Sequence, residues 1–99
     1  MARFEVFVDP TGEGYLLDVQ ADVLDGFNTR IVVPLLPAST APAPSRRLNP
    51  VFEIQGATYV MVTQFMGAVP VSILREPVAT LKDQDTEVTS ALDMAFFGF

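Results

Sequence analysis

Apolar and polar residues alternate along much of residues 4–74, which is typical of short β-strands. Apolar side chains occupy every second position from Phe4 to Val8, and this predicts a first strand with one mainly apolar face. Prolines, glycines and acidic residues interrupt the alternation and mark turns. We therefore expect five to seven short antiparallel strands, with the clearest runs at 4–8, 15–19, 30–33, 51–55, 57–65 and 69–74.

The residues between these runs predict how the strands connect. Asp9–Gly14 contains one proline and two glycines, as expected of a loop between antiparallel strands. Gly56 separates two runs that we expect to form a hairpin. Residues 59–62 are apolar on both faces of their strand, so a barrel or a dimer interface has to cover both. Pro34 is expected to end the third strand, because proline cannot donate to a sheet ladder.

From Thr80 onward the apolar spacing changes to that of a helix, with Thr80 or Asp83 as the predicted N-cap. Acidic residues crowd its first turns, where they suit the helix dipole. The apolar face consists of Leu81, Val88, Leu92, Ala95 and Phe96. Phe97 and Phe99 are then left over, and Gly98 ends the helix easily. They either fold back into a core or dimer interface, or form an exposed aromatic wedge for a partner protein.

Residues 34–50 form the one long irregular connection, and five prolines keep it extended. Its only basic cluster is Arg46-Arg47, which we interpret as part of a solvated loop. Two charges supply little of the salt-dependent affinity that a phosphate-binding surface needs.

Composition narrows the function. Of the 99 residues 49% are hydrophobic and only 18% charged, which is more apolar surface than a small monomer readily hides, so we expect a homodimer. A net charge of −6 repels phosphate backbones and argues against direct nucleic-acid binding. Without cysteine there are no disulfides or thiolate metal sites, and without histidine the commonest acid–base group near neutral pH is missing. The sequence has neither a signal peptide nor a membrane-spanning run, which favours a cytoplasmic protein with no membrane contact.

Three carboxylates, Asp18, Asp22 and Asp25, fall within eight residues and are the main candidates for chemistry. Asp18 alternates with apolar neighbours, which places it on the outer face of its strand. The three lack an obvious apolar pocket that would separate their pKa values, and their spacing does not match a calcium loop. We therefore expect no catalytic residue, no metal and no cofactor, and a protein that acts through a surface that includes the tail.

Four segments in the same order and spacing give the chain a resemblance to the CcdB toxins, which covers residues 4–99: Asp18–Asp22, Thr29–Leu35, Val69–Ile73 and Phe96–Phe99. The resemblance implies a single CcdB-like toxin domain over residues 1–99, with an SH3-like β-barrel and one C-terminal α-helix. It also implies a homodimer that binds the DNA gyrase A subunit and traps the gyrase–DNA cleavage complex. A CcdA-like antitoxin would neutralise it. The toxin and antitoxin together would repress their own operon, and the antitoxin would make most of the DNA contacts. Such toxin–antitoxin pairs serve in plasmid maintenance.

In this family the last residues and a neighbouring apolar pair bind gyrase. Carried over by position, the gyrase-binding residues are Val23, Leu24, Asp93, Phe96, Phe97, Gly98 and Phe99. The chain ends in Phe97-Gly98-Phe99, whereas the best-known members end in Trp-Gly-Ile, and Asp93 replaces a neutral asparagine. Two alternatives remain open at this point: a MazF-like endoribonuclease toxin on the same barrel, and a CcdB-like binding module without gyrase activity.

Overall fold

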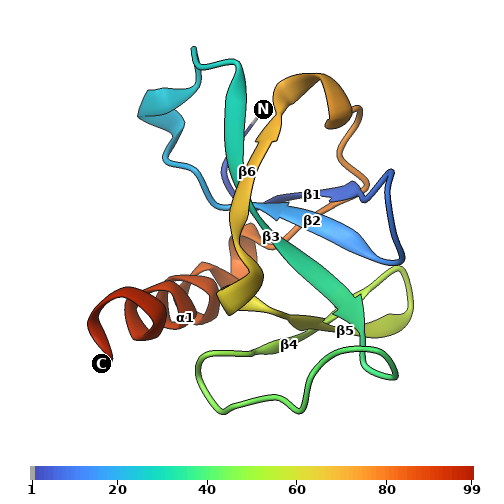
Figure 1. The fold of residues 1–99 in the computed structure, drawn as a ribbon, viewed down its shortest axis with the longest axis vertical. Helices are drawn as coiled ribbons and strands as arrows, with labels where there is room; N and C mark the ends of the chain where they lie inside the picture. The colour runs from blue at the N-terminus through green and yellow to red at the C-terminus, as the bar shows by residue number, and fades with distance from the viewer. Residues whose placement is uncertain (1) are drawn as a thin grey trace.

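The computed structural model describes residues 2–99, which form seven strands and one α-helix (Figure 1). The elements are β1 (Glu5–Val8), β2 (Tyr15–Asp18), β3 (Thr29–Pro37), β4 (Val51–Ile54), β5 (Ala57–Met61), β6 (Gly67–Pro70), β7 (Ala79–Thr80) and α1 (Asp85–Phe97). Short 3-10 turns lie at Asp22–Leu24, Thr63–Phe65, Val71–Ile73 and Lys82–Gln84. The mainly β class with one C-terminal helix is confirmed.

All strand pairs are antiparallel, and β3 is the strand that organises them. The order β4-β5-β3-β2-β1-β7 curls into a nearly closed barrel, and β6 pairs with β3 outside this path. Along one edge β3 pairs with β2, and along the other it pairs first with β6 and then with β5 (Figure 1). The long β3 thus joins the two parts of the sheet.

Pro34 does not end the third strand, and in this respect the sequence prediction was wrong. It pairs with Leu16 of β2 and lies between the part of β3 that pairs with β6, which ends at Val32, and the part that pairs with β5, which begins at Leu35. At this change of partner a missing N–H costs the ladder least. The Pro34 carbonyl still accepts a hydrogen bond from the Val62 N–H, at 3.0 Å.

Two apolar clusters cover the two faces of the sheet. The larger fills the barrel and receives the helix, while the smaller lies under β6 and the turn that follows it. Leu17 of β2 belongs to the larger cluster and Leu16 to the smaller, so both faces of β2 are buried. Asp18 is consequently buried as well, with 0% exposure, rather than on an outer face as its alternation suggested.

Two predicted strands are shorter than their apolar runs. The run at 57–65 stops pairing at Met61, and the run at 69–74 pairs only as far as Pro70 before a 3-10 turn. The hairpin at Gly56 is confirmed: Gln55 and Gly56 have φ values of 53° and 84°, as two-residue hairpin turns require.

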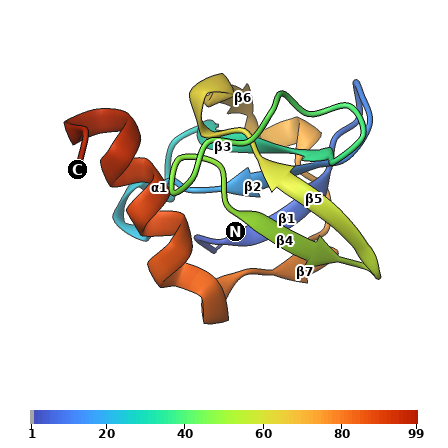
Figure 2. The same ribbon diagram turned by 90° about the horizontal axis from the view of Figure 1, so that it is seen from below.

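Helix α1 packs across one end of the barrel through Val88, Ala91 and Leu92, and its last turns project beyond it (Figure 2). It begins after a 3-10 turn, and its N-cap residue is Gln84 rather than Thr80 or Asp83. The Thr80 hydroxyl instead accepts a hydrogen bond from the Lys82 N–H at 3.2 Å. As predicted, Gly98 ends the helix in the left-handed conformation, with φ 78° and its N–H donated to the Met94 carbonyl at 3.1 Å.

Candidate functional site

Three phenylalanine side chains are exposed at the end of α1. Phe96, Phe97 and Phe99 have 66%, 67% and 78% of their surface open to solvent. The sequence analysis left two alternatives for Phe97 and Phe99, a core or dimer interface and an exposed wedge, and both rings are exposed in this chain. It wrongly assigned Phe96 to the buried face. Leu92 is buried one turn earlier, but near the end of α1 the neighbouring residues cover only part of the Phe96 ring.

Phe97 and Phe99 lie against each other across Gly98. Their ring centroids are 6.3 Å apart and their planes are inclined by 40°, within the range of attractive aromatic pairs. The positive φ of Gly98 turns the chain back at this point, which places Phe99 beside Phe97 instead of one helical step further on. The two rings form one compact apolar feature.

Leu24 and Phe96 are brought together at a second apolar feature, although 72 residues separate them in the chain. Both line a hollow of about 300 Å³ between α1 and the segment after β2. Met66 and Leu92 form its apolar wall, and Arg3 and Gln20 are also part of the lining. Val23 is 88% exposed beside this hollow and does not line it.

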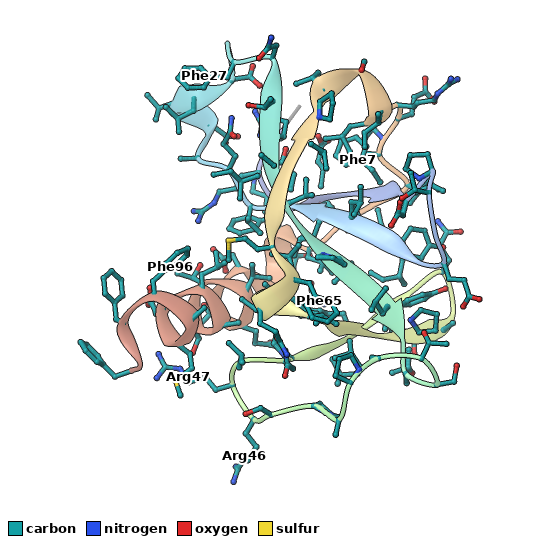
Figure 3. All side chains as sticks on the ribbon, in the orientation of Figure 1. Phe7, Phe27, Arg46, Arg47, Phe65 and Phe96 are labelled. Atoms are coloured by element: carbon teal, nitrogen blue, oxygen red, sulfur yellow. The ribbon has the colours of Figure 1, made fainter. Side chains whose placement is uncertain are left out.

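Phe96 borders a further hollow on its other side. This space of about 450 Å³ lies between α1 and the 3-10 turn after β5, and its lining includes Leu48, Met66 and Met94. Phe96 therefore stands between two hollows and is a prominent part of an apolar surface that joins the helix to the barrel. Figure 3 shows its ring on the side of α1 that faces the segment carrying Phe27.

Asp93 lies apart from Phe96 and from both of these hollows. It lines a polar hollow of about 380 Å³ together with Arg47, Thr89 and Ser90. The Arg47 guanidinium donates to the Ser90 hydroxyl at 2.6 Å, which ties the proline-rich loop to the helix. Figure 3 shows Arg47 and Phe96 on opposite sides of α1. Of the predicted residues, the structure pairs Leu24 with Phe96 and Phe97 with Phe99, and it sets Asp93 on another side of the helix.

The sequence analysis missed a buried charge network below the Val23-Leu24 segment. Arg30 of β3 is 0% exposed, and its Nε donates to Asp18 Oδ2 at 2.9 Å, while Nη2 is 2.6 Å from the same oxygen. Its Nη1 donates to Asp25 Oδ1 at 2.9 Å. The sequence held one signal for this network, because Asp18 and Arg30 have opposite charges and lie on adjacent predicted strands. The signal was missed because Asp18 was predicted to face outward.

Burial raises the pKa of the Asp18 carboxyl group above its usual value. The hydrogen bonds and positive charge of Arg30, together with the Gln20 N–H, act in the opposite direction. Among residues 2–99 no group of three or more acidic side chains is arranged to hold a metal ion, and no helix is both long and apolar enough to cross a membrane.

The chain is thus a small, nearly closed antiparallel β-barrel with exposed apolar surface at the end of its one α-helix. A solved endoribonuclease, in complex with its cognate antitoxin from a mycobacterial species, has the same fold: the TM-score is 0.74 at 15% identity, over 96% of this chain and 93% of that one. The family model described as CcdB protein matches residues 3–98. The chain belongs to the CcdB family, whose members are toxins of toxin–antitoxin systems.

Proposed function

We propose that this protein is a toxin that binds the DNA gyrase A subunit and traps gyrase on cleaved DNA. The binding surface consists of Val23, Leu24, Asp93, Phe96, Phe97, Gly98 and Phe99. The observation that supports this most directly is the exposure of three aromatic rings, each by about two thirds or more, at one end of α1. A small protein gains nothing in stability from such exposure, and apolar surface of this kind marks contact sites.

The paired rings of Phe97 and Phe99 are suited to a cationic partner. A guanidinium stacked on an exposed ring contributes about 0.5–1 kcal/mol, and about 2 kcal/mol once water is excluded. Aromatic residues near the centre of a desolvated patch often dominate an interface. Phe97-Gly98-Phe99 thus offers an anchor, and the 300 Å³ hollow between Leu24 and Phe96 is wide enough for an apolar side chain of gyrase.

Asp93 adds a charge on another side of α1, away from Phe96 and the apolar hollows. It is half-buried near Arg47, and a carboxylate that loses its remaining water on binding requires a cation in return. We propose that gyrase supplies a basic side chain here. This acidic side chain distinguishes the chain from relatives with a neutral residue at the position.

The remaining partners follow from the same proposal. The toxin is a cytoplasmic homodimer in which each chain forms a single domain, and a CcdA-like antitoxin neutralises it. The solved endoribonuclease with the same fold is held by its own cognate antitoxin, which supports a partner of this kind. Toxin and antitoxin together repress their operon, and the antitoxin contacts the DNA, because a protein of net charge −6 is repelled by phosphates.

RNA cleavage is the less supported alternative. The solved neighbour shares the fold at 15% identity, a likeness that carries no chemistry. Cleaving RNA requires basic side chains along a groove, and the chain has only six. Arg30 is fully buried against carboxylates, so it is not available to a phosphate backbone in a groove.

Deletion of Gly98 and Phe99 tests the proposal. We expect growth arrest and retention of the gyrase A subunit to be lost, because one ring of the pair and the turn that places it are removed. The thermal midpoint and the sedimentation mass, expected to be twice 10.8 kDa, should stay nearly unchanged, since neither residue is buried. Phe65→Ala is the matched control, because it removes a ring that is 55% exposed on the 3-10 turn after β5 and is not among the residues of the proposed surface.

Three results would overturn the gyrase assignment. The first is undiminished growth arrest by the deletion variant, and the second is arrest in a strain whose gyrase resists CcdB toxins. The third is cleavage of total RNA by the purified protein, which would favour the endoribonuclease. Tight antitoxin binding without any gyrase binding would identify a binding module instead.

A further inference from the structure

The segment between β2 and β3 carries two residues of the proposed surface but has little apolar packing of its own. Its 3-10 turn, Asp22–Leu24, contains no buried residue, and Val23 is 88% exposed. An exposed turn of this kind is expected to sample several conformations. Binding would then cost the entropy of ordering it, unless other contacts already hold it in place.

Gln20 supplies the first such contact. Its side chain is only 5% exposed, and its Nε2 donates to the Leu24 carbonyl at 3.0 Å. Its Oε1 accepts the Ile31 N–H at 3.1 Å, which fixes the amide group to β3. The Gln20 side chain therefore connects the backbone of the turn to the central strand of the sheet.

Arg30 supplies the second contact from the same strand. Its buried guanidinium is held by Asp18, and Nη1 extends to Asp25 at the far end of the turn at 2.9 Å. Asp18 Oδ1 in turn accepts the Gln20 N–H at 3.0 Å. Arg30 thus holds the far end of the segment directly at Asp25 and the near end at Gln20 through Asp18.

The energetic cost of this arrangement suggests a role beyond stability. Moving a guanidinium and a carboxylate out of water is expensive, and apolar residues of similar size often stabilise a core as well or better. Here the charges lie directly below two residues of the proposed surface. Leu24 and Gln20 also line the hollow that Phe96 borders, so the position of the turn determines the shape of that hollow.

We infer that Arg30, Gln20 and Asp25 are positioning residues, which hold Leu24 opposite Phe96 before gyrase arrives. This inference rests on the proposed function, because it gives the segment a role in gyrase binding. The turn at 20–25 is ordered by polar contacts to β3 in the free toxin as well, and this order can be measured without gyrase.

Asp25→Ala is the primary test, because the Asp25 side chain is 58% exposed and its loss leaves the Asp18–Arg30 pair in place. We expect amide exchange of Leu24, Asp25 and Phe27, whose N–H groups donate within the turn, to rise about tenfold. The affinity for purified gyrase A subunit should fall about three- to tenfold, mainly through faster dissociation. The thermal midpoint should change little.

A rescue and a control make the test specific. Asp25→Asn keeps an oxygen that accepts from Arg30, and it should restore most of the affinity and the slow exchange. Asp83→Ala removes an exposed acid of the same charge from the 3-10 turn before α1, and it should alter neither. Gln20→Met, which removes the link to Leu24, should raise exchange at the same amides.

The two proposals fail in different ways. Leu24→Ala tests the surface itself, and unchanged gyrase affinity in that variant would remove Leu24 from the proposed site. If Leu24→Ala weakens binding while Asp25→Ala changes neither exchange nor affinity, the positioning role is wrong and the surface remains. If Asp25→Asn binds gyrase as weakly as Asp25→Ala while its turn amides exchange as slowly as in the unaltered toxin, the effect comes from the lost charge and the positioning role is likewise wrong.

Discussion

At the scale of single residues, the most demanding group in this protein is the Arg30 guanidinium. It is permanently charged and fully buried, so each direction in which it donates needs an acceptor. Asp18 supplies a carboxylate inside the barrel wall, and Asp25 supplies one at the edge. The two acids therefore differ in their effect on stability. Asp18 compensates a buried positive charge, whereas Asp25 is partly exposed and its removal should cost less free energy of unfolding.

Arg30→Met should destabilise the protein by about 3–5 kcal/mol, because it leaves the Asp18 carboxylate buried without its cation. The loss in the double variant Asp18→Leu/Arg30→Met should be smaller than the sum of the two single losses. Denaturant unfolding of the four proteins measures this coupling. Additive losses would show that the pair contributes no interaction of its own.

The Arg30→Met variant should also acquire a characteristic pH dependence. Burial already raises the pKa of Asp18, and the opposing effect of Arg30 is gone in the variant, so the folded pKa rises further. A carboxyl group whose pKa is higher in the folded state takes up a proton on folding, and its contribution to stability falls as pH rises through that interval. The deficit of the variant should therefore be larger at about pH 7 than at about pH 5. A deficit that shrinks toward neutral pH would contradict this assignment.

For single residues, the sequence indicated which side chains are exposed better than it indicated which side chains contact each other. Phe97 and Phe99 were left off the apolar face of the helix because that face cannot bury two adjacent rings. Whether they folded back or stayed exposed was left open, and both are exposed. Phe96 was misassigned, because helical spacing shows which face a residue shares but not where the neighbouring barrel ends. Asp18 was misassigned because alternation predicts an outer face only when one face of the strand is solvated, and both faces of β2 are covered.

At the scale of elements, two glycines in turns show how backbone geometry and close packing differ. Gly14, before β2, and Gly56, between β4 and β5, both have positive φ, at 93° and 84°. A Cβ at Gly14 would overlap the Leu35 carbonyl oxygen of β3, whereas a Cβ at Gly56 would meet open space. Gly14 thus permits the close approach of two chain segments, and Gly56 serves only its own turn.

Alanine substitutions at the two glycines should separate these effects. Gly56→Ala is expected to cost about 1 kcal/mol, from backbone strain alone. Gly14→Ala adds a steric overlap with backbone and should cost about 3 kcal/mol or more. Thermal or denaturant unfolding of the two variants measures the difference, and equal losses would show that the β3 backbone yields without cost at Leu35.

Hairpins and the C-terminal helix could be predicted, whereas strand lengths could not. The turn signals at Asp9–Gly14 and Gly56 are local, and local backbone chemistry decides them. Strand ends depend on partners instead. Strand β3 runs through Pro34 because its neighbour changes there, and β6 stops at Pro70 because the next residues form a 3-10 turn.

At the scale of the whole molecule, the net negative charge of the toxin opposes direct binding to DNA. With a net charge of −6, the purified protein should not retard operator DNA at physiological salt, whereas its mixture with the cognate antitoxin should. A mobility-shift titration over a range of salt concentrations measures this. Retardation by the toxin alone, weakening steeply with salt, would reveal a basic surface that the composition does not suggest.

The composition indicated that the molecule has an excess of apolar surface, but only the fold shows where that surface lies. From a chain this apolar we expected a homodimer, which stays a prediction, and the structure leaves three aromatic rings exposed at the end of α1. Which residues meet there could not be predicted without tertiary structure, because Leu24 and Phe96 come from distant parts of the chain. Asp93 illustrates the converse, since it is close to Phe96 in sequence but faces Arg47.

The proline-rich connection is anchored firmly at both ends. The Ala38 N–H bonds to the Thr58 carbonyl at 3.4 Å, and the buried Asn49 side chain donates to the Met61 carbonyl at 3.0 Å and to Gln64 at 2.8 Å. Lengthening a loop whose ends are fixed costs little, about 0.6 kcal/mol for each doubling. The exposed residues 42–44 are therefore a suitable point at which to insert a fluorescent or affinity label, one that leaves the aromatic end of the helix free to be observed in action.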